Sequence, residues 1–408
     1  MTDTRLSAPH LRQPSWGGVL AMSLAAFVLV ASEFMPVSLL TPIATDFQVS
    51  EGQAGLSISV SGLFALLTSL VIASVAARVG RKRLLLCLAL LMIASATVTA
   101  FAPNYALFMA GRALIGIAIG GFWSLSAATA MRLVPEDQVP RALAIVNGGN
   151  ALATVIAAPL GSFLGALIGW RGAFFCIVPV AAIAAVWLLL SVPTLRPRGH
   201  SGSGNVRRLR RRMPVALGML AVSVLFMGQF MLFTYLRPFL ETVTQVSAAT
   251  LSLMLLVLGV AGFVGTFLIE RFLQQSLYRT LIAIPLLLAV IALALVGFGG
   301  SAVTTTVLLG GWGLVATAAP VGWWTWLART LPDDAEAGGG LMVAIIQLAI
   351  AAGATAGGLV FDLSGYRATF ESSAALLVLA AALAFGCAMA SCKATASWSR
   401  ADMPGLDL

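Results

Sequence analysis

The chain has 408 residues, of which 60% are hydrophobic and only 10% are charged, and its mean hydropathy is +0.99. Soluble globular proteins carry about 25% charged residues, so this composition excludes a soluble protein and indicates a membrane protein. The net charge of +9 would suit a nucleic-acid partner, but nearly all basic residues fall in short segments between apolar runs, which argues against one.

Apolar runs that are long enough to cross about 30 Å of hydrocarbon as helices recur along the whole chain. They are continuous rather than alternating every second residue, which excludes a β-barrel. The fold class is therefore an all-α polytopic membrane protein. We predict twelve transmembrane helices, at residues 16–40, 52–77, 84–102, 105–131, 142–168, 173–193, 214–237, 247–269, 280–299, 302–328, 339–361 and 369–390.

One long polar stretch, residues 194–213, separates the first six predicted helices from the last six. Its glycine, serine and arginine content is typical of a solvated linker. We therefore predict an N-terminal six-helix bundle (1–193), a cytoplasmic linker (194–213), a C-terminal six-helix bundle (214–390) and a cytoplasmic tail (391–408).

The orientation in the membrane follows from the distribution of lysine and arginine, which gather on one side. Cytoplasmic loops carry the excess of these residues, so both termini are predicted to be cytoplasmic. A cleaved signal peptide is the alternative for the first apolar run, but the length of that run favours its retention. The basic segments are the N-terminus (Arg5, Arg12), residues 78–83, Arg132, Arg141, the linker, Arg271, Arg279, Arg329 and the tail (Lys393, Arg400).

The two halves of the sequence repeat each other. The segment "MRLVPEDQ" (131–138) returns as "ARTLPDDA" (328–335), and "GWRGAF" (169–174) returns as "GYRATF" (365–370). The matching positions lie 196 or 197 residues apart, which indicates a duplication into two pseudo-symmetric bundles. Parallel six-helix repeats with a substrate site between the halves are typical of transporters.

Two ionisable residues lie deep within the predicted helices of the first half. Glu33 stands about 25 Å along its helix from Trp16, and Arg112 lies about 10 Å from the outer end of the fourth helix. The two therefore lie at comparable depth and are candidates for an ion pair. Intramembrane ionisable residues mark ion or substrate pathways, and Glu33 is predicted to carry a proton that it releases when water or Arg112 approaches. The alternatives are a structural bond between helices for Glu33 and helix packing for Arg112.

Three stretches resemble motifs of the major facilitator superfamily. "AARVGRKR" (76–83) is similar to its signature cytoplasmic loop, "GRALIGIAIGG" (111–121) to its fourth-helix pattern, and "AAPLGSFLG" (157–165) to part of its antiporter motif. The resemblance implies the major facilitator fold and a gating role for the loop residues Arg78, Gly80 and Arg81. Ala73 and Ala77 stand where that loop usually has glycine and aspartate, so one charge pair of the gate is missing.

Within that superfamily, three further stretches resemble the bacterial purine ribonucleoside efflux permeases: "EFMPVSLLTPIA" (33–44), "GGFWSLSAATAMRLVP" (120–135) and "FTYLRP" (233–238). This resemblance implies a proton-coupled antiporter of the bacterial inner membrane that exports inosine and guanosine by alternating access. It also implies a monomer that uses the proton gradient and needs no cofactor. The sugar-efflux branch shares the first-helix pattern, so the alternative is efflux of sugars or drugs.

A nucleoside needs aromatic faces for stacking and amides for its polar edges. The predicted substrate-binding residues are Phe122, Trp123, Asn147, Asn150, Gln229, Phe233, Tyr235, Arg237, Trp323 and Gln347. Amides also hydrogen-bond between helices, and Arg237 is close enough to its helix end to reach the interface. Trp324 and Trp326 are predicted to anchor the chain at the membrane surface, where tryptophans gather.

The sequence disfavours two other classes of membrane protein. A membrane enzyme would need a cluster of Asp, His or Cys at one membrane face, and the chain has only two histidines. The nearest acids suit helix N-termini better; they are Glu136, Asp137, Asp333, Asp334 and Glu336. A channel is disfavoured by the buried titratable acid. We therefore predict no enzyme activity and no metal site.

Overall fold

The computed structural model of the protein describes residues 15–193, 213–331 and 335–401. The predicted domain boundaries at residues 193 and 214 border an undescribed stretch and stay a prediction. Several residues singled out above lie outside the described set, namely Arg5, Arg12, the linker before Met213, Asp333, Asp334 and the end of the tail, together with the side chains of Glu136, Glu336, Lys393 and Arg400.

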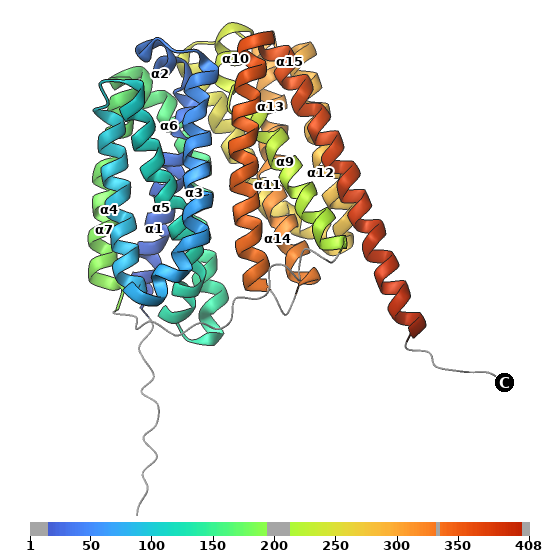
Figure 1. Ribbon diagram of the computed structural model, residues 1–408. Coiled ribbons are helices and arrows are strands. Elements are labelled where there is room, and N and C mark those ends of the chain that lie inside the picture. The colour runs from blue at the N-terminus through green and yellow to red at the C-terminus, as the bar shows by residue number, and fades with distance from the viewer. Residues whose placement is uncertain (1–14, 194–212, 332–334, 402–408) are drawn as a thin grey trace, which may run out of the picture.

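Within the described ranges, every regular element is a helix (Figure 1). The first half contains α1 (Trp16–Ser38), α2 (Leu40–Phe47), α3 (Glu51–Val79), α4 (Arg81–Ala100), α5 (Tyr105–Leu133), a short 3₁₀ turn (Glu136–Gln138), α6 (Val139–Phe175) and α7 (Ile177–Ser191). The second half contains α9 (Met213–Phe233), α10 (Leu236–Thr242), α11 (Ala248–Gln275), α12 (Leu277–Phe298), α13 (Ala302–Ala316), α14 (Ala319–Thr330) and α15 (Ala335–Ala401).

Ten helical stretches among the described residues are long and apolar enough to cross a membrane, and two of them are twice the usual length. These two, Val139–Ser191 and Gly338–Ser391, are 53 and 54 residues long, whereas one crossing needs about 20. Each is divided by a glycine in the left-handed region, Gly169 with φ +76° and Gly365 with φ +78°. Glycine adopts this conformation without the steric penalty of a Cβ atom. The ten stretches therefore provide twelve crossings, which confirms the predicted fold.

The backbone repeats with the same offset as the sequence. Gly169 and Gly365 are 196 residues apart, and Gln48 and Gln245, both with φ +55°, are 197 apart. Two residues after each glutamine a serine caps the next helix, because the hydroxyl of Ser50 accepts from the Gln53 amide and that of Ser247 from the Thr250 amide. These caps satisfy amides that have no partner within the helix. Both halves therefore begin their second crossing with the same turn.

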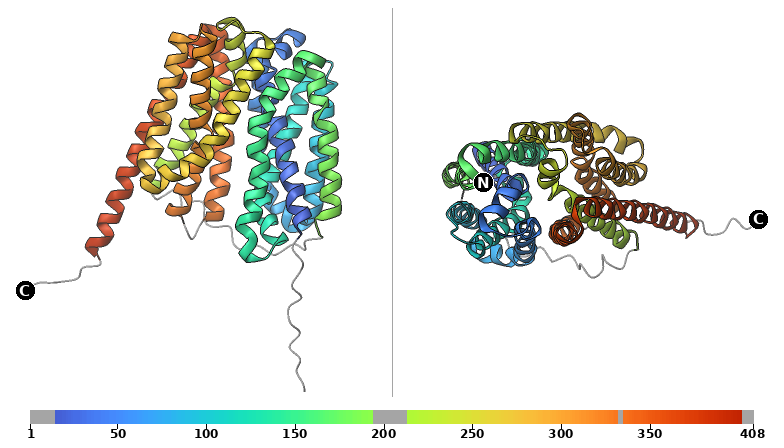
Figure 2. Two further views of the ribbon diagram at one scale, coloured as in Figure 1. Left: turned by 180° about the vertical axis from the view of Figure 1, so that it is seen from behind. Right: turned by 90° about the horizontal axis from the view of Figure 1, so that it is seen from above.

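The helices form two groups that lie side by side when viewed from above (Figure 2, right). Each group has its own apolar core, one built mainly on α1, α4, α5 and α7 and the other on α9, α12 and α15. Small residues let helices approach closely inside each group. A Cβ atom on Gly116 would overlap the Ser61 carbonyl, and one on Gly313 would overlap the Leu258 carbonyl. These two contacts are again related by the repeat, and both suit the close helix packing of membrane bundles.

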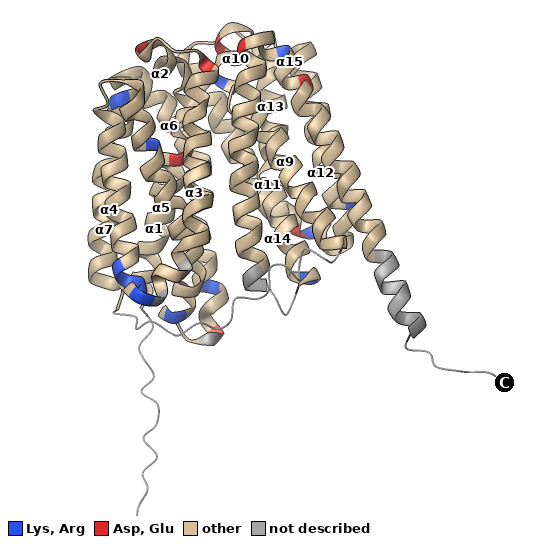
Figure 3. Ribbon diagram, in the orientation of Figure 1, with Lys and Arg blue, Asp and Glu red and all other residues tan. Residues whose placement is uncertain are grey.

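Basic residues mark one end of the bundle, which we call the basic end (Figure 3, bottom). They lie at the junctions between α3 and α4, α5 and α6, α11 and α12, and α14 and α15: Arg78, Arg81, Lys82, Arg83, Arg132, Arg141, Arg271, Arg279 and Arg329. The opposite end, which we call the far end, carries the turns at Gly169 and Gly365 and the helices α2 and α10.

Candidate functional site

Glu33 lies where the two halves face each other. Its side chain is only 5% exposed, and its Oε1 accepts a hydrogen bond of 3.4 Å from Nε2 of Gln347 on α15. We call the surface on which α1, α3 and α6 face α9, α11 and α15 the seam. The deeply placed acid of the first half therefore contacts the second half directly, across the seam.

Arg112 of α5 is fully buried, and it lies beside Glu33 of α1. Its guanidinium donates to the backbone carbonyls of Ser32 at 2.8 Å, Glu33 at 2.9 Å and Ser57 at 3.3 Å. A fourth, longer contact of 3.4 Å reaches the hydroxyl of Ser61. Arg112 thus joins α1, α3 and α5 through the backbone, and the described ion pairs include none between Arg112 and the Glu33 carboxylate. The suggested ion pair is absent from this conformation.

An aromatic pair lies next to Glu33 on the seam. Phe34 of α1 stacks on Phe230 of α9 with ring centroids 5.7 Å apart and an interplanar angle of 29°. The two residues are 196 positions apart, so the repeat relates them and the pair lies on the pseudo-two-fold axis. Gln229, the counterpart of Glu33, has a buried Oε1 that has no hydrogen-bond partner in the described part of the chain. Gln229 directly precedes Phe230 on α9, and its unpaired amide oxygen is able to accept a hydrogen bond from a polar ligand.

Sequence reasoning missed Phe34 and Phe230. The repeat offset could have identified them. It relates two phenylalanines, each of which directly follows a polar residue within an apolar helix, Glu33 or Gln229.

The seam also holds Phe233, Tyr235 and Arg237 from the predicted substrate-binding set. Phe233 packs edge-to-face on Phe230 at 5.8 Å. The buried hydroxyl of Tyr235 donates to the Ala354 carbonyl at 2.8 Å. Arg237 pairs with Glu241 at 2.8 Å and also donates to the carbonyl of Ser38 in the first half. Tyr235 is fully buried, with its hydroxyl against Gly55 of α3 in the first half, and Arg237 closes the far end across the seam.

Other members of the predicted substrate-binding set lie elsewhere. Phe122, 2% exposed, packs in the core of the first half and meets Trp123 edge-to-face at 5.7 Å. Trp323, 2% exposed, packs in the core of the second half. Asn147 is exposed on α6, and Asn150 is partly buried one turn further along. In the described part of the chain no hydrogen bond or ring contact joins any of these five side chains to Gln229 or Gln347.

Trp324 and Trp326, both predicted to anchor the chain at the membrane surface, differ in their exposure. Trp324 is 42% exposed, as an interfacial side chain would be. Trp326 is fully buried, packs against Gly218 and meets Trp323 at 5.5 Å, so the prediction that it anchors the chain at the surface is wrong. Residues two apart on a helix point about 200° away from each other, which is why only one of them reaches the surface.

The predicted gating loop lies at the basic end. Gly80 has φ +84° and separates α3 from α4. The guanidinium of Arg81 donates to the Ala128 carbonyl of α5 at 2.7 Å, and Arg78 is exposed at the end of α3. These contacts all lie within the first half, and the gating role of the loop stays a prediction.

The two halves meet towards the far end and separate towards the basic end, as Figure 1 shows for the ribbons. Ser59 of α3 donates to the Ala351 carbonyl of α15 at 2.9 Å, and Gly259 of α11 lies against the backbone of Val155 on α6. Nearer the basic end, a Cβ atom added to Gly148 or Gly340 would have no described atom within 4 Å apart from the backbone of its own helix.

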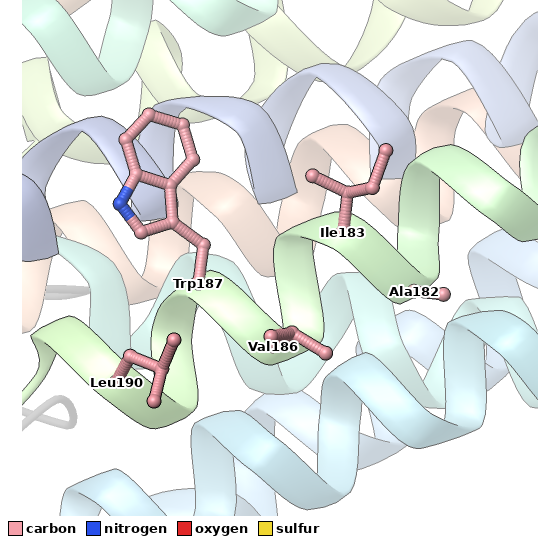
Figure 4. A pocket seen from close by; sticks show the side chains of 5 residues that line it. All are labelled: Ala182, Ile183, Val186, Trp187 and Leu190. Carbon is pink, nitrogen blue, oxygen red and sulfur yellow. The ribbon is translucent and has the colours of Figure 1, made fainter.

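A shallow surface groove of about 390 Å³ lies on the exposed face of α7 (Figure 4). It is lined by Ala182, Ile183, Val186, Trp187 and Leu190. An almost wholly apolar lining offers nothing to recognise a polar solute, so this groove is a membrane-facing surface and is not the functional site.

Two pseudo-symmetric six-helix groups with a buried acid between them define a membrane transporter. Residues 22–354 match the family model described as "Major Facilitator Superfamily". The chain belongs to the major facilitator superfamily, whose members are transporters and not enzymes.

Curated relatives cover nearly the whole chain. It is 61% identical over 385 residues to "Transcription regulatory protein OpdE" of Pseudomonas aeruginosa, covering 93% of this chain and 96% of that one. It is 39% identical over 377 residues to "Purine ribonucleoside efflux pump NepI" of Salmonella paratyphi B and 40% identical over 376 residues to the protein of that name from Shigella sonnei, in both cases covering 92% of this chain and 95% of the relative.

Solved structures share the fold. A bacterial homologue of the human lysosomal transporter Spinster, in an inward-facing and unoccupied conformation, matches with a TM-score of 0.78 at 17% identity, covering 94% of this chain and 98% of that one. The human organic anion transporter MFSD10 matches with a TM-score of 0.66 at 19% identity, covering 92% and 100%.

Proposed function

We propose that the protein is a proton-coupled antiporter that exports purine ribonucleosides such as inosine and guanosine by alternating access. The observation that carries the proposal is Glu33, an acid buried on the seam whose carboxylate contacts Gln347 of the opposite half. A titratable group placed there experiences a different environment whenever the halves move apart. Its protonation is therefore linked to the conformation of the protein.

The energy of one proton is sufficient for export. A proton that enters down a membrane potential of about 150 mV releases about 3.5 kcal/mol. This corresponds to a gradient of several hundredfold for a neutral solute exchanged one for one. No cofactor is needed, since the proton gradient supplies the energy, and a monomer suffices because both halves of the transporter belong to one chain.

The positive-inside rule supports an orientation in the bacterial inner membrane with the basic end in the cytoplasm. The separation of the two groups of helices towards the basic end (Figure 1) then corresponds to an inward-facing conformation. In such a state a cytoplasmic substrate reaches the seam from the basic end, and the far end is closed by the contacts of Tyr235 with Gly55 and of Arg237 with Ser38.

Purine ribonucleosides are the proposed substrates because several relatives at 39–40% identity are named purine ribonucleoside efflux pumps. The chemistry of the seam agrees with this choice. Phe34 and Phe230 present aromatic faces, and base stacking on such faces contributes about 1–3 kcal/mol per base. The unpaired oxygen of Gln229 is suited to accept a hydrogen bond from a purine edge or a ribose hydroxyl.

The decisive experiment is uptake of radiolabelled inosine, guanosine, pentoses and drugs into inverted vesicles with an imposed pH gradient. Gradient-dependent uptake of inosine and guanosine is the expected result. Uptake of a pentose or a drug in their place would support sugar or multidrug efflux and overturn the purine assignment.

A second candidate function is suggested by the relative named a transcription regulatory protein. A bundle of membrane-spanning helices can change transcription indirectly, by exporting a small molecule to which a soluble regulator responds. Transcript levels should then change equally in a deletion strain and in a strain with a transport-inactive variant. Normal transcript levels with the inactive variant would instead indicate regulation that is independent of transport.

A further inference from the structure

The N-terminus of α3 at the far end receives a carboxylate from the other half. Asp362 of α15 accepts a hydrogen bond of 2.5 Å from the Ser50 hydroxyl and one of 3.0 Å from the backbone amide of Gly52. Ser50 is the N-cap residue of α3, and it forms a reciprocal capping box with Gln53. The helix thus has its own complete cap, and Asp362 adds a second, negatively charged one across the seam.

The electrostatics favour this contact for both helices. The N-terminus of a helix carries a partial positive charge and its C-terminus a partial negative charge. Asp362 lies three residues before the Gly365 turn, near the C-terminal end of its own helical segment, where a carboxylate is unfavourable. The contact of the Asp362 carboxylate with the N-terminus of α3 offsets its unfavourable interaction with the C-terminal end of its own helix. The carboxylate therefore favours the conformation in which the far end is closed.

The Asp362 carboxylate fills the space beside the Gly52 Cα atom. A Cβ atom at Gly52 would overlap the Asp362 carboxylate and would lie 2.7 Å from the Gly358 carbonyl. The glycine is therefore needed because α15 approaches the first turn of α3 so closely.

The second half provides an internal comparison. The repeat places Ala249 at the position of Gly52, and Ala166 at the position of Asp362. Ser247 still caps α11, but α6 has no carboxylate to add to that cap. The glycine and the aspartate occur together at the contact between α3 and α15, and alanine stands at both positions in the corresponding pair, α11 and α6. The arrangement is therefore specific to one side of the seam.

We propose that Asp362 is a latch that holds the far end closed by capping α3 across the seam, and that it must release α3 before the far end can open. This inference uses only the alternating-access part of the proposed function. It requires neither a purine substrate nor a proton, so it can be tested without either.

The test measures the far end directly in the full-length protein. Spin labels on cysteines placed at the exposed positions Thr45 of α2 and Ala249 of α11, in a background without native cysteines, report the separation of the halves by electron–electron double resonance. Asp362→Asn removes the charge and Gly52→Ala disturbs the docking by steric overlap. Each should raise the ratio of the long-distance to the short-distance population by about fivefold, the effect of a charged helix cap.

Asp46→Asn is the matched control, because Asp46 is a far-end acid that pairs with Arg171 inside the first half. It should leave the distance distribution unchanged. Salt provides a further readout, since screening at about 1 M reduces the interaction between partly exposed charges. The difference between wild type and Asp362→Asn should therefore shrink as salt is added, whereas the effect of Gly52→Ala should persist.

A distance distribution for Asp362→Asn that matches wild type and Asp46→Asn would overturn the latch, even if Gly52→Ala opens the far end. Asp362→Ala, which removes both hydrogen bonds and leaves the Ser50–Gln53 cap of α3 in place, serves as the replacement if either variant fails to fold. Because no substrate or gradient is present, failure of nucleoside export in vesicles would refute the proposed substrate and leave this result standing.

Discussion

The most direct test of the proposed mechanism is Glu33→Gln. The substitution keeps the size of the side chain and its ability to hydrogen-bond with Gln347, but it removes the titratable group. Because the hydrogen bond across the seam is retained, and such bonds contribute only about 0.6 kcal/mol in membrane proteins, the variant should fold with nearly wild-type stability. Any loss of coupling is then attributable to the proton.

The expected magnitude follows from the pH gradient. With no membrane potential, one pH unit is worth about 1.36 kcal/mol per proton, which supports about a tenfold inosine gradient at one proton per substrate. Wild-type inverted vesicles should reach this ratio, and Glu33→Gln should stay close to one. Exchange of labelled for unlabelled inosine should continue in the variant, since that exchange needs no proton.

Glu270→Gln is the matched control, because Glu270 is an exposed acid on α11 away from the seam. It should accumulate inosine as wild type does. The reasoning is refuted if Glu33→Gln still builds a gradient that grows tenfold with each pH unit, because the proton would then be carried elsewhere.

Three further substitutions test the packing and the binding surface. Arg112→Leu leaves several buried carbonyls without a donor and should destabilise the protein by about 3 kcal/mol or more, measured as a lowered midpoint of thermal unfolding in detergent; an unchanged midpoint would show that these bonds contribute little. Gly313→Ala should lower the same midpoint through steric overlap, whereas Gly297→Ala, where nothing lies within 4 Å, should not. Phe34→Ala should raise the KM for inosine about tenfold by removing a stacking face, while Phe267→Ala, whose side chain is 68% exposed, should leave KM unchanged.

The sequence predicted the fold well because its governing constraints are local. Each crossing needs about 20 apolar residues, and the turns at Gly169 and Gly365 occur where the repeated motif "GWRGAF" or "GYRATF" begins. The internal duplication repeats two of the connecting segments, 131–138 and 169–174, so the boundaries at these segments are supported in both halves.

The candidate site was less predictable, because side-chain contacts depend on which face a helix turns towards its neighbour. Depth correctly suggested that Glu33 and Arg112 lie near each other, but it could not tell that the guanidinium binds backbone carbonyls in place of the carboxylate. Aromatic residue type alone did not separate Trp326, in the core, from Trp324, at the surface. The interaction of Glu33 with Gln347 spans 314 residues, and no local pattern encodes such a pairing.

The bonds of Arg112 have a consequence for how hydration reaches Glu33. Because the Arg112 guanidinium on α5 donates to the backbone carbonyls of Ser32 and Glu33, it fixes the α1 backbone against α5 beside the acid. The partner of the Glu33 carboxylate, Gln347, belongs to the opposite half. Withdrawal of the second half would therefore open the carboxylate to water without any change in the backbone that carries it.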